Sequence, residues 1–168
     1  YKMEKRLEPP TINTKKELHN IYESVFKSSL PMTKKERILN SIFGYESWSW
    51  RVVGISKKAL DVFKNNEFKY KSGVFQRDHY FQPRYITMRK MLENFMQIQE
   101  WWDWYWNNDK TLLITKDEHS KKDYTFEKDI IKIDWSHGYF VSNPVAGFYY
   151  TQKREGNFLK KLVKKNNL

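Results

Sequence analysis

The side chains best suited to chemistry lie in two short segments of the chain. The first is Arg77-Asp78-His79, and the second runs from Thr111 to Asp123 and contains His119. A carboxylate and an imidazole can hold a divalent cation, and a second imidazole can exchange a proton near neutral pH. Metal-assisted hydrolysis of a phosphodiester uses these groups. The pattern carries that chemistry only if folding brings the two segments together.

The residues around these segments predict a strand, a second strand and a helix that meet at one end. Residues 68–79 are extended in composition and finish at Asp78-His79, whereas residues 111–114 form a short strand rich in leucine and β-branched side chains. Thr115 and Glu118 then make a capping box, which places His119 in the first turn of a helix. The connection contains a helical stretch over 86–106, with a break near Gln97.

The alternation of side chains along a strand predicts different roles for Asp78 and His79. Successive residues point to opposite faces, so the two side chains diverge. Asp78 and His119 are then placed to hold a divalent ion. His79 is left free to act as a base.

The flanking residues predict further elements of an α+β fold. Helices are expected over 14–26 and 33–43, each opened by a capping box at Thr14 or Thr33, followed by a strand over 48–55 and a helix capped by Ser56. Further on we expect a strand over 130–133, a hairpin over 138–150 bent at Asn143-Pro144 and Gly147, and a final basic helix. The expected organisation is one domain over 1–168, with a core at about 68–123, an N-terminal helical part at 11–66 and a C-terminal hairpin and basic helix at 124–168.

Composition limits the classes of protein that fit. Hydrophobic residues make up 39% of the 168 positions and aromatic residues 17%, which excludes a disordered chain. The net charge of +11 predicts a polyanionic partner, nucleic acid rather than a membrane, with a basic proteome or a solubility device as the alternative explanation. The absence of cysteine excludes disulfides and zinc–cysteine sites. No apolar run approaches the roughly 20 residues of a membrane span and no signal peptide is visible, so we expect a cytoplasmic protein without a membrane partner.

Taken together, the two segments resemble the HNH, or ββα-metal, nucleases, especially small phage and bacterial members. Asp78-His79 matches the family's first pair, and His119 matches the distal metal ligand at the start of the helix. Lys122 matches a basic residue often found there, and Asp123 lies where some bacteriocin members place a further ligand. The resemblance covers about residues 70–123. It implies a ββα-metal core decorated by N-terminal helices and by a C-terminal hairpin and helix.

The chain departs from the family at the middle residue of the motif. Relatives usually carry an asparagine nine residues before the distal ligand, whereas this chain has Lys110. Asn108 or Asp109 serves after a small shift, and we take Asn108 as the catalytic candidate while leaving the other two open. The cysteine knuckles of many relatives are missing, so no structural zinc is expected.

The resemblance implies a metal-dependent DNA endonuclease with one divalent ion, Mg²⁺, Mn²⁺ or Ni²⁺. We expect Asp78, His119 and Asp123 to bind the metal and His79 to activate water. The expected substrate is double-stranded DNA, cut site-specifically in a restriction-like or homing-like manner by a homodimer, or by a monomer that nicks twice. The alternatives are a non-catalytic nucleic-acid-binding protein and a bacteriocin or toxin nuclease domain. The residues expected to contact DNA are Arg77, Lys121 and Lys122 at phosphates and Arg51, Arg84 and Arg89 at base edges.

The remaining aromatic and histidine residues have simpler interpretations. Four tryptophans between Trp101 and Trp106 fall largely on one helical face, which favours core packing over stacking on bases. Trp48 and Trp50 alternate on an expected strand, where stacking and packing are equally compatible. His19 is expected to be structural, and His137 to lie in a turn.

Overall fold

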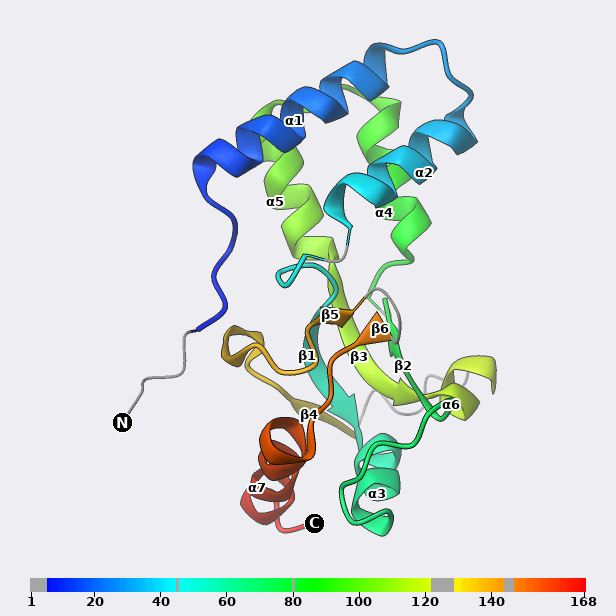
Figure 1. The fold of residues 1–168 in the computed structure, drawn as a ribbon. Helices are drawn as coiled ribbons and strands as arrows, with labels where there is room; N and C mark the ends of the chain where they lie inside the picture. The colour runs from blue at the N-terminus through cyan, green and yellow to red at the C-terminus, as the bar shows by residue number, and fades with distance from the viewer. Residues whose placement is uncertain (1–5, 45, 80, 122–128, 144–146) are drawn as a thin grey trace.

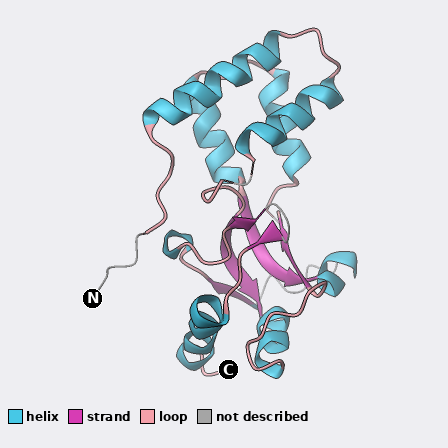
Figure 2. Cartoon of the chain, in the orientation of Figure 1, coloured by secondary structure: helices cyan, strands magenta, loops and turns pink. Residues whose placement is uncertain are grey.

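The chain folds into a helical lobe stacked on a second lobe built around a β-sheet (Figure 1). The computed structural model describes residues 6–44, 46–79, 81–121, 129–143 and 147–168. Helices and strands are both abundant and interleaved along the chain, as the colouring in Figure 2 makes plain, so the predicted α+β class is confirmed. None of the helices in these ranges combines the length and the apolar character needed to cross a bilayer.

The helical lobe consists of four helices contributed by two separate parts of the chain. Its members are α1 (Ile12–Lys27), α2 (Met32–Phe43), α4 (Arg84–Glu93) and α5 (Ile98–Asn108). The first two are N-terminal, whereas α4 and α5 lie in the long connection between two strands of the sheet. The predicted break near Gln97 is confirmed, because Gln97 is the residue that precedes α5. The lobes therefore do not follow the predicted division into residues 11–66 and 68–123.

Aromatic rings fill the core of the helical lobe. Trp101 and Tyr105 of α5 are fully buried, and the Tyr105 ring stacks on Phe43 with ring centroids 3.7 Å apart. His19 is buried in the same cluster, where its Nε2 lies 2.9 Å from the carbonyl oxygen of Met96. The predictions of a packed tryptophan face and a structural His19 are confirmed. These contacts fix α5, whose C-terminal end leads directly into the sheet.

The sheet has four strands in the order β2-β3-β1-β4. Strand β2 pairs antiparallel with β3, β3 pairs parallel with β1, and β1 pairs antiparallel with β4. Helix α6 follows β3 with no intervening residue, so β2, β3 and α6 form a ββα unit. The bounds are β1 (Arg51–Ser56), β2 (Phe75–Asp78), β3 (Lys110–Thr115), α6 (Lys116–Lys121) and β4 (Ile130–Lys132).

The two faces of the sheet are covered differently. One face packs through Ile55, Phe75 and Leu113 against α3 (Lys57–Asn65), α7 (Asn157–Lys165) and the small hairpin formed by β5 (Ser142–Asn143) and β6 (Gly147–Phe148). The opposite face carries a separate cluster that contains Leu112 and Ile114. Asp78 is paired with Leu112 in the β2–β3 register and therefore points to this second face. Arg77, paired with Leu113, points to the first.

The capping predictions have mixed outcomes. The box at Thr115 is confirmed: the Glu118 N–H donates to the Thr115 hydroxyl, and the Thr115 N–H donates to the Glu118 carboxylate. Ser56 also caps α3 as predicted, by accepting from the N–H of Ala59. The two N-terminal boxes are wrong. Thr11 rather than Thr14 caps α1, and α2 begins after Pro31 without a side-chain cap.

Several predicted strands are shorter than expected. Only residues 75–78 of the predicted 68–79 strand pair with β3, because β3 ends at Thr115 and the chain then turns into α6. Residues 48–50 precede β1 instead of belonging to it. Within the predicted hairpin over 138–150, β5 (Ser142–Asn143) pairs with β6 (Gly147–Phe148), the Tyr149 N–H donates to the Val141 carbonyl oxygen, and Pro144 lies outside the described residues. His137 ends a 3-10 turn (Trp135–His137), as predicted for a turn residue.

Candidate active site

The ββα unit brings Asp78 and His119 together. Asp78 ends β2, and the capping box at Thr115 sets the start of the helix that carries His119. The Nδ1 atom of His119 lies 3.5 Å from Oδ1 of Asp78. The His119 side chain is 52% exposed and that of Asp78 18% exposed, so solvent reaches the pair.

The pair has the donor set and spacing that a divalent ion accepts. Two ligand atoms bound to one ion at about 2.1 Å lie roughly 3.0–3.4 Å apart, depending on the bond angle. The observed Asp78–His119 separation is close to this range. One carboxylate oxygen and one imidazole nitrogen suit Mg²⁺, Mn²⁺ or Ni²⁺, with water in the other positions. The described ranges contain no group of three or more His, Cys, Asp or Glu side chains placed to hold a metal, and the predicted ligand Asp123 lies outside them, as does Lys122.

His79 is not the free side chain that the sequence predicted. It is only 9% exposed, and its Nε2 lies 2.8 Å from Oδ1 of Asp109. Asp109 lies between the end of α5 and the start of β3, at the far end of the connection through α4 and α5. The fold thus brings His79 next to the Asp109 carboxylate, a contact that the alternation of side chains along β2 could not predict.

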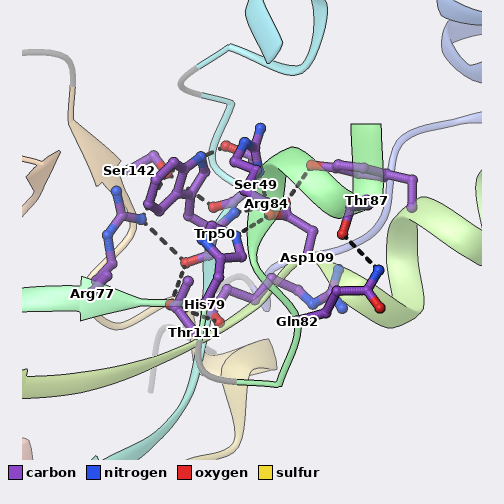
Figure 3. A network of polar contacts seen from close by, with 12 residues as sticks. Ser49, Trp50, Arg77, His79, Gln82, Arg84, Thr87, Asp109, Thr111 and Ser142 are labelled. Atoms are coloured by element: carbon purple, nitrogen blue, oxygen red, sulfur yellow. Dashed lines mark hydrogen bonds and ion pairs between the residues drawn. The ribbon is translucent and has the colours of Figure 1, made fainter. Parts of the chain in front are cut away.

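Asp109 is the centre of a buried polar network, drawn in Figure 3. Its Oδ1 accepts from His79 and, at 2.5 Å, from Nη1 of Arg84, whereas its Oδ2 accepts from the Trp50 N–H at 2.8 Å and from the Tyr105 hydroxyl. Burial alone would raise the pKa of Asp109. The hydrogen bond from His79 and the positive charge of Arg84 outweigh burial and hold that pKa well below its ordinary value.

The network fixes the protonation of its histidine. Burial lowers the pKa of His79, although its hydrogen bond to Asp109 opposes the shift, so the ring is neutral at pH 7. An ionised carboxylate only accepts hydrogen bonds, so the Nε2 atom must carry the hydrogen. The Nδ1 atom therefore keeps its lone pair. Asp109 thus orients the imidazole and leaves one nitrogen able to take a proton.

Stability is expected to fall when the pH is lowered, in two stages. The pKa of His79 is lower in the folded protein than its ordinary value of 6.5, so the unfolded chain binds the proton first and stability is lost below about pH 6.5. Asp109 adds a second loss as the pH falls below its ordinary pKa of 3.8. Urea unfolding between pH 4.5 and 8 measures the first stage. A His79→Gln variant is expected to lose that stage, and an unchanged slope in the variant would contradict the assignment.

Trp50 is held next to this network in a strained backbone conformation. Its φ of 54° lies in the left-handed region, which disfavours side chains other than glycine. The carbonyl oxygen of Trp50 accepts from Arg77 and from Thr111, each at 3.1 Å, in addition to the contact of its N–H with Asp109. The Trp50 ring meets the His79 ring edge-to-face at a centroid distance of 4.2 Å. Trp48 and Trp50, for which packing and stacking were equally compatible, differ in the structure: Trp48 is buried and Trp50 is partly exposed.

The structure corrects the predicted role of Asn108. Its side-chain amide donates to the carbonyl oxygen of Trp104, one turn back in α5. Asp109, the next residue, meets His79 instead. Of the three residues considered for the middle of the motif, Asp109 is therefore the one that enters the site.

Three predicted DNA-contacting arginines make contacts inside the protein. Arg51 is 5% exposed and lies over the Trp106 ring at 3.4 Å, so its predicted role as a base reader is wrong. Arg84 is directed to Asp109 and Asn40. Arg77 donates to Trp50, Ser142 and Gly147. Arg84 and Arg77 thereby contact the network around Asp109 and Trp50, whereas Arg51 packs on the tryptophan rings.

The other predicted contacts lie on the surface. Arg89 on α4 and Lys121 on α6 are both exposed, and each pairs with a nearby carboxylate, Glu36 and Asp117 respectively. Exposed ion pairs of this kind contribute little to stability and separate easily. The exposed lysines of α7 add to the basic surface: Lys160, Lys161, Lys164 and Lys165.

Comparisons with known proteins identify no relative: no family model, no curated protein and no solved structure matches this chain.

Proposed function

We propose that this protein is a metal-dependent DNA endonuclease of the HNH type that hydrolyses phosphodiester bonds. The observation that carries the proposal is the ββα unit formed by β2, β3 and α6, which sets Asp78 and His119 within 3.5 Å of each other. A second support is the position of His79 directly after Asp78, with its tautomer fixed by Asp109. The proposal gives roles to the same three residues that the resemblance names.

In this proposal the two residues at the end of β2 have different roles, one in metal binding and the other in proton transfer. Asp78 and His119 hold a divalent ion, which stabilises negative charge on the phosphate oxygens when bound. His79 takes a proton from the attacking water through Nδ1. Asp109 holds the imidazole in the productive tautomer and stabilises its charged form after proton transfer. Trp50 packs on the histidine ring and limits its rotation.

Charge supports nucleic acid as the substrate. The net charge is +11, and the exposed lysines of α6 and α7 include Lys121, Lys160 and Lys164. The helical lobe and α7 add surface to the ββα unit, which supports a site-specific cutter of double-stranded DNA over one without sequence preference. Because Arg51 and Arg84 are engaged inside the protein, base reading falls to exposed side chains such as Arg89.

A plasmid cleavage assay tests the proposal. We expect purified protein to nick or cut plasmid DNA with Mg²⁺ or Mn²⁺, to lose that activity in a chelator, and to require far more metal when His119 is replaced by Ala. Loss of a group that only supports a metal ligand already costs about 10–100-fold in metal affinity or activity, so loss of the ligand itself should cost at least as much. His137→Ala is the matched control, because it removes another exposed histidine beside an aspartate, 3.6 Å from Asp134. Equal metal dependence of both variants would contradict the proposed site.

The second candidate is a non-catalytic nucleic-acid-binding protein. It is favoured by the burial of His79 and by the two-residue ligand set within the described ranges. Binding of DNA without cleavage in any divalent metal would support this candidate instead. A discrete ladder of fragments, in contrast, would support site-specific cutting.

A further inference from the structure

A cavity of about 640 Å³ lies beside the edge strand β2 and has no role in the reaction proposed above. Its volume falls in the range of about 300–1,000 Å³ that small-molecule and cofactor sites occupy. The walls come from β2, from the chain before it, from the first residue of α6 and from the β5–β6 hairpin. The residues that matter to the argument are Trp50, Tyr70, Gln76, Arg77, Lys116 and Phe148.

Aromatic rings form one part of the wall. Tyr70 meets Phe148 edge-to-face with centroids 5.7 Å apart, and it also contacts Phe75 at 6.2 Å. Tyr70 is half-buried, so part of its ring is available to a bound group. Trp50 closes the side nearest His79. Flat apolar walls of this kind favour a planar, aromatic ligand.

Cationic and amide groups form the other part. Lys116 is exposed at the start of α6, and the half-buried Gln76 offers an amide that can both donate and accept. Arg77 also lines the cavity, and its guanidinium donates to Trp50, Ser142 and Gly147. Lys116 therefore adds positive charge to the aromatic surface of the cavity. An apolar ligand would leave the Lys116 ammonium desolvated, whereas a bare anion would leave the rings uncovered.

The position of the cavity connects it to the candidate active site. Gln76 and Arg77 directly precede Asp78 and His79, and Lys116 lies three residues before His119. Along a strand, three residues span about 10 Å, which is the reach of one or two nucleotides from the Asp78 end of β2. A base can enter such a cavity only after leaving the stack of a duplex, which costs least where the base is unpaired.

We infer that this cavity binds an unpaired nucleobase of the DNA substrate, with Lys116 near its phosphates and Tyr70 against its ring. The inference rests on the proposed function in taking DNA as the ligand. It adds that the protein prefers DNA with a bulged or unpaired nucleotide close to the scissile bond.

Binding without metal tests the inference separately from catalysis. Wild-type protein in chelator is titrated into a fully paired duplex and into the same duplex with one bulged 2-aminopurine, with anisotropy and 2-aminopurine emission as readouts. We expect about tenfold tighter binding of the bulged duplex and a change in its emission. Tyr70→Leu and Lys116→Ala are expected to reduce the preference to below threefold.

Matched variants and a free nucleotide sharpen the outcome. Tyr149→Leu removes an exposed tyrosine directly after β6, and Lys57→Ala removes an exposed lysine at the start of α3. Both variants should keep the preference for the bulged duplex. Adenosine monophosphate should compete only at millimolar concentration. Equal affinity for both duplexes, or competition by the free nucleotide as strong as by bulged DNA, overturns the inference.

The two proposals fail in different ways. Metal-dependent cutting with no preference for the bulge leaves the endonuclease standing and removes the base site. A preference for the bulge without cutting in any metal keeps the base site and removes the catalytic proposal.

Discussion

The Asp109→Asn substitution is expected to lower the free energy of unfolding by about 3–5 kcal/mol, as is typical when one partner of a buried charge pair is removed. Asp109 is 1% exposed, and both of its oxygens accept hydrogen bonds. Asparagine replaces one acceptor oxygen with an NH₂ group. Whichever way the amide is turned, this group faces a donor, either Arg84 and His79 or the Trp50 N–H.

Loss of the negative charge adds to that effect. The guanidinium of Arg84 is largely buried against Asp109 and would lose its ion pair. Urea unfolding at pH 7, followed by tryptophan fluorescence and circular dichroism, measures the change. Asp103→Asn is the control, because Asp103 is an exposed aspartate on α5, the helix that ends directly before Asp109, and the variant should change stability by less than about 0.5 kcal/mol. If Asp109→Asn lowered the free energy of unfolding no more than Asp103→Asn does, the network would contribute little to stability.

The features that were predictable from sequence depend on neighbours along the chain. The capping box at Thr115 and Glu118 involves residues three apart, and it fixed the phase of α6 and hence the direction of His119. Alternation along β2 places Asp78, paired with Leu112, and Arg77, paired with Leu113, on opposite faces of the sheet, and β2 ends at Asp78, directly before His79. The proximity of Asp78 and His119 followed from these two local rules and one strand pairing.

The features that were missed depend on contacts between distant elements. His79 meets a carboxylate 30 residues away, and the partner is fixed by the packing of α5 in the helical lobe. The acidic residue just before β3 was visible as Asp109, but spacing alone ranked it no higher than Asn108. The left-handed conformation of Trp50 had no signal at all, because a non-glycine residue adopts it only when surrounding contacts impose it.

Strand lengths failed for a related reason. Composition made residues 68–79 look extended throughout, yet a strand is only as long as the ladder available to it. Strand β2 lies at the edge of the sheet and can pair only with β3, whose last paired residue is Thr115. The seven residues before Phe75 instead help to line the cavity, through Tyr70, Ser72 and Gly73.

His79→Gln is expected to lower the rate of DNA cleavage by about 10²–10⁴-fold, the usual contribution of a general base. Glutamine can still donate a hydrogen bond to Asp109, so the network keeps a partner, but it cannot take up a proton. DNA affinity should stay within about twofold. Raising the metal concentration should not restore the rate, whereas it should partly restore His119→Ala. That contrast separates a proton-transferring residue from a metal ligand.

The pH profile gives an independent measurement of the same role. Since burial lowers the pKa of His79, wild-type kcat/KM should rise with pH through an apparent pKa below 6.5 and then level off near neutrality. The residual activity of His79→Gln should lack this acid limb. His19→Gln, which replaces another buried histidine far from the strand end, should keep both the limb and the rate once its stability is matched. An acid limb that survives in His79→Gln would assign the proton transfer to a different group.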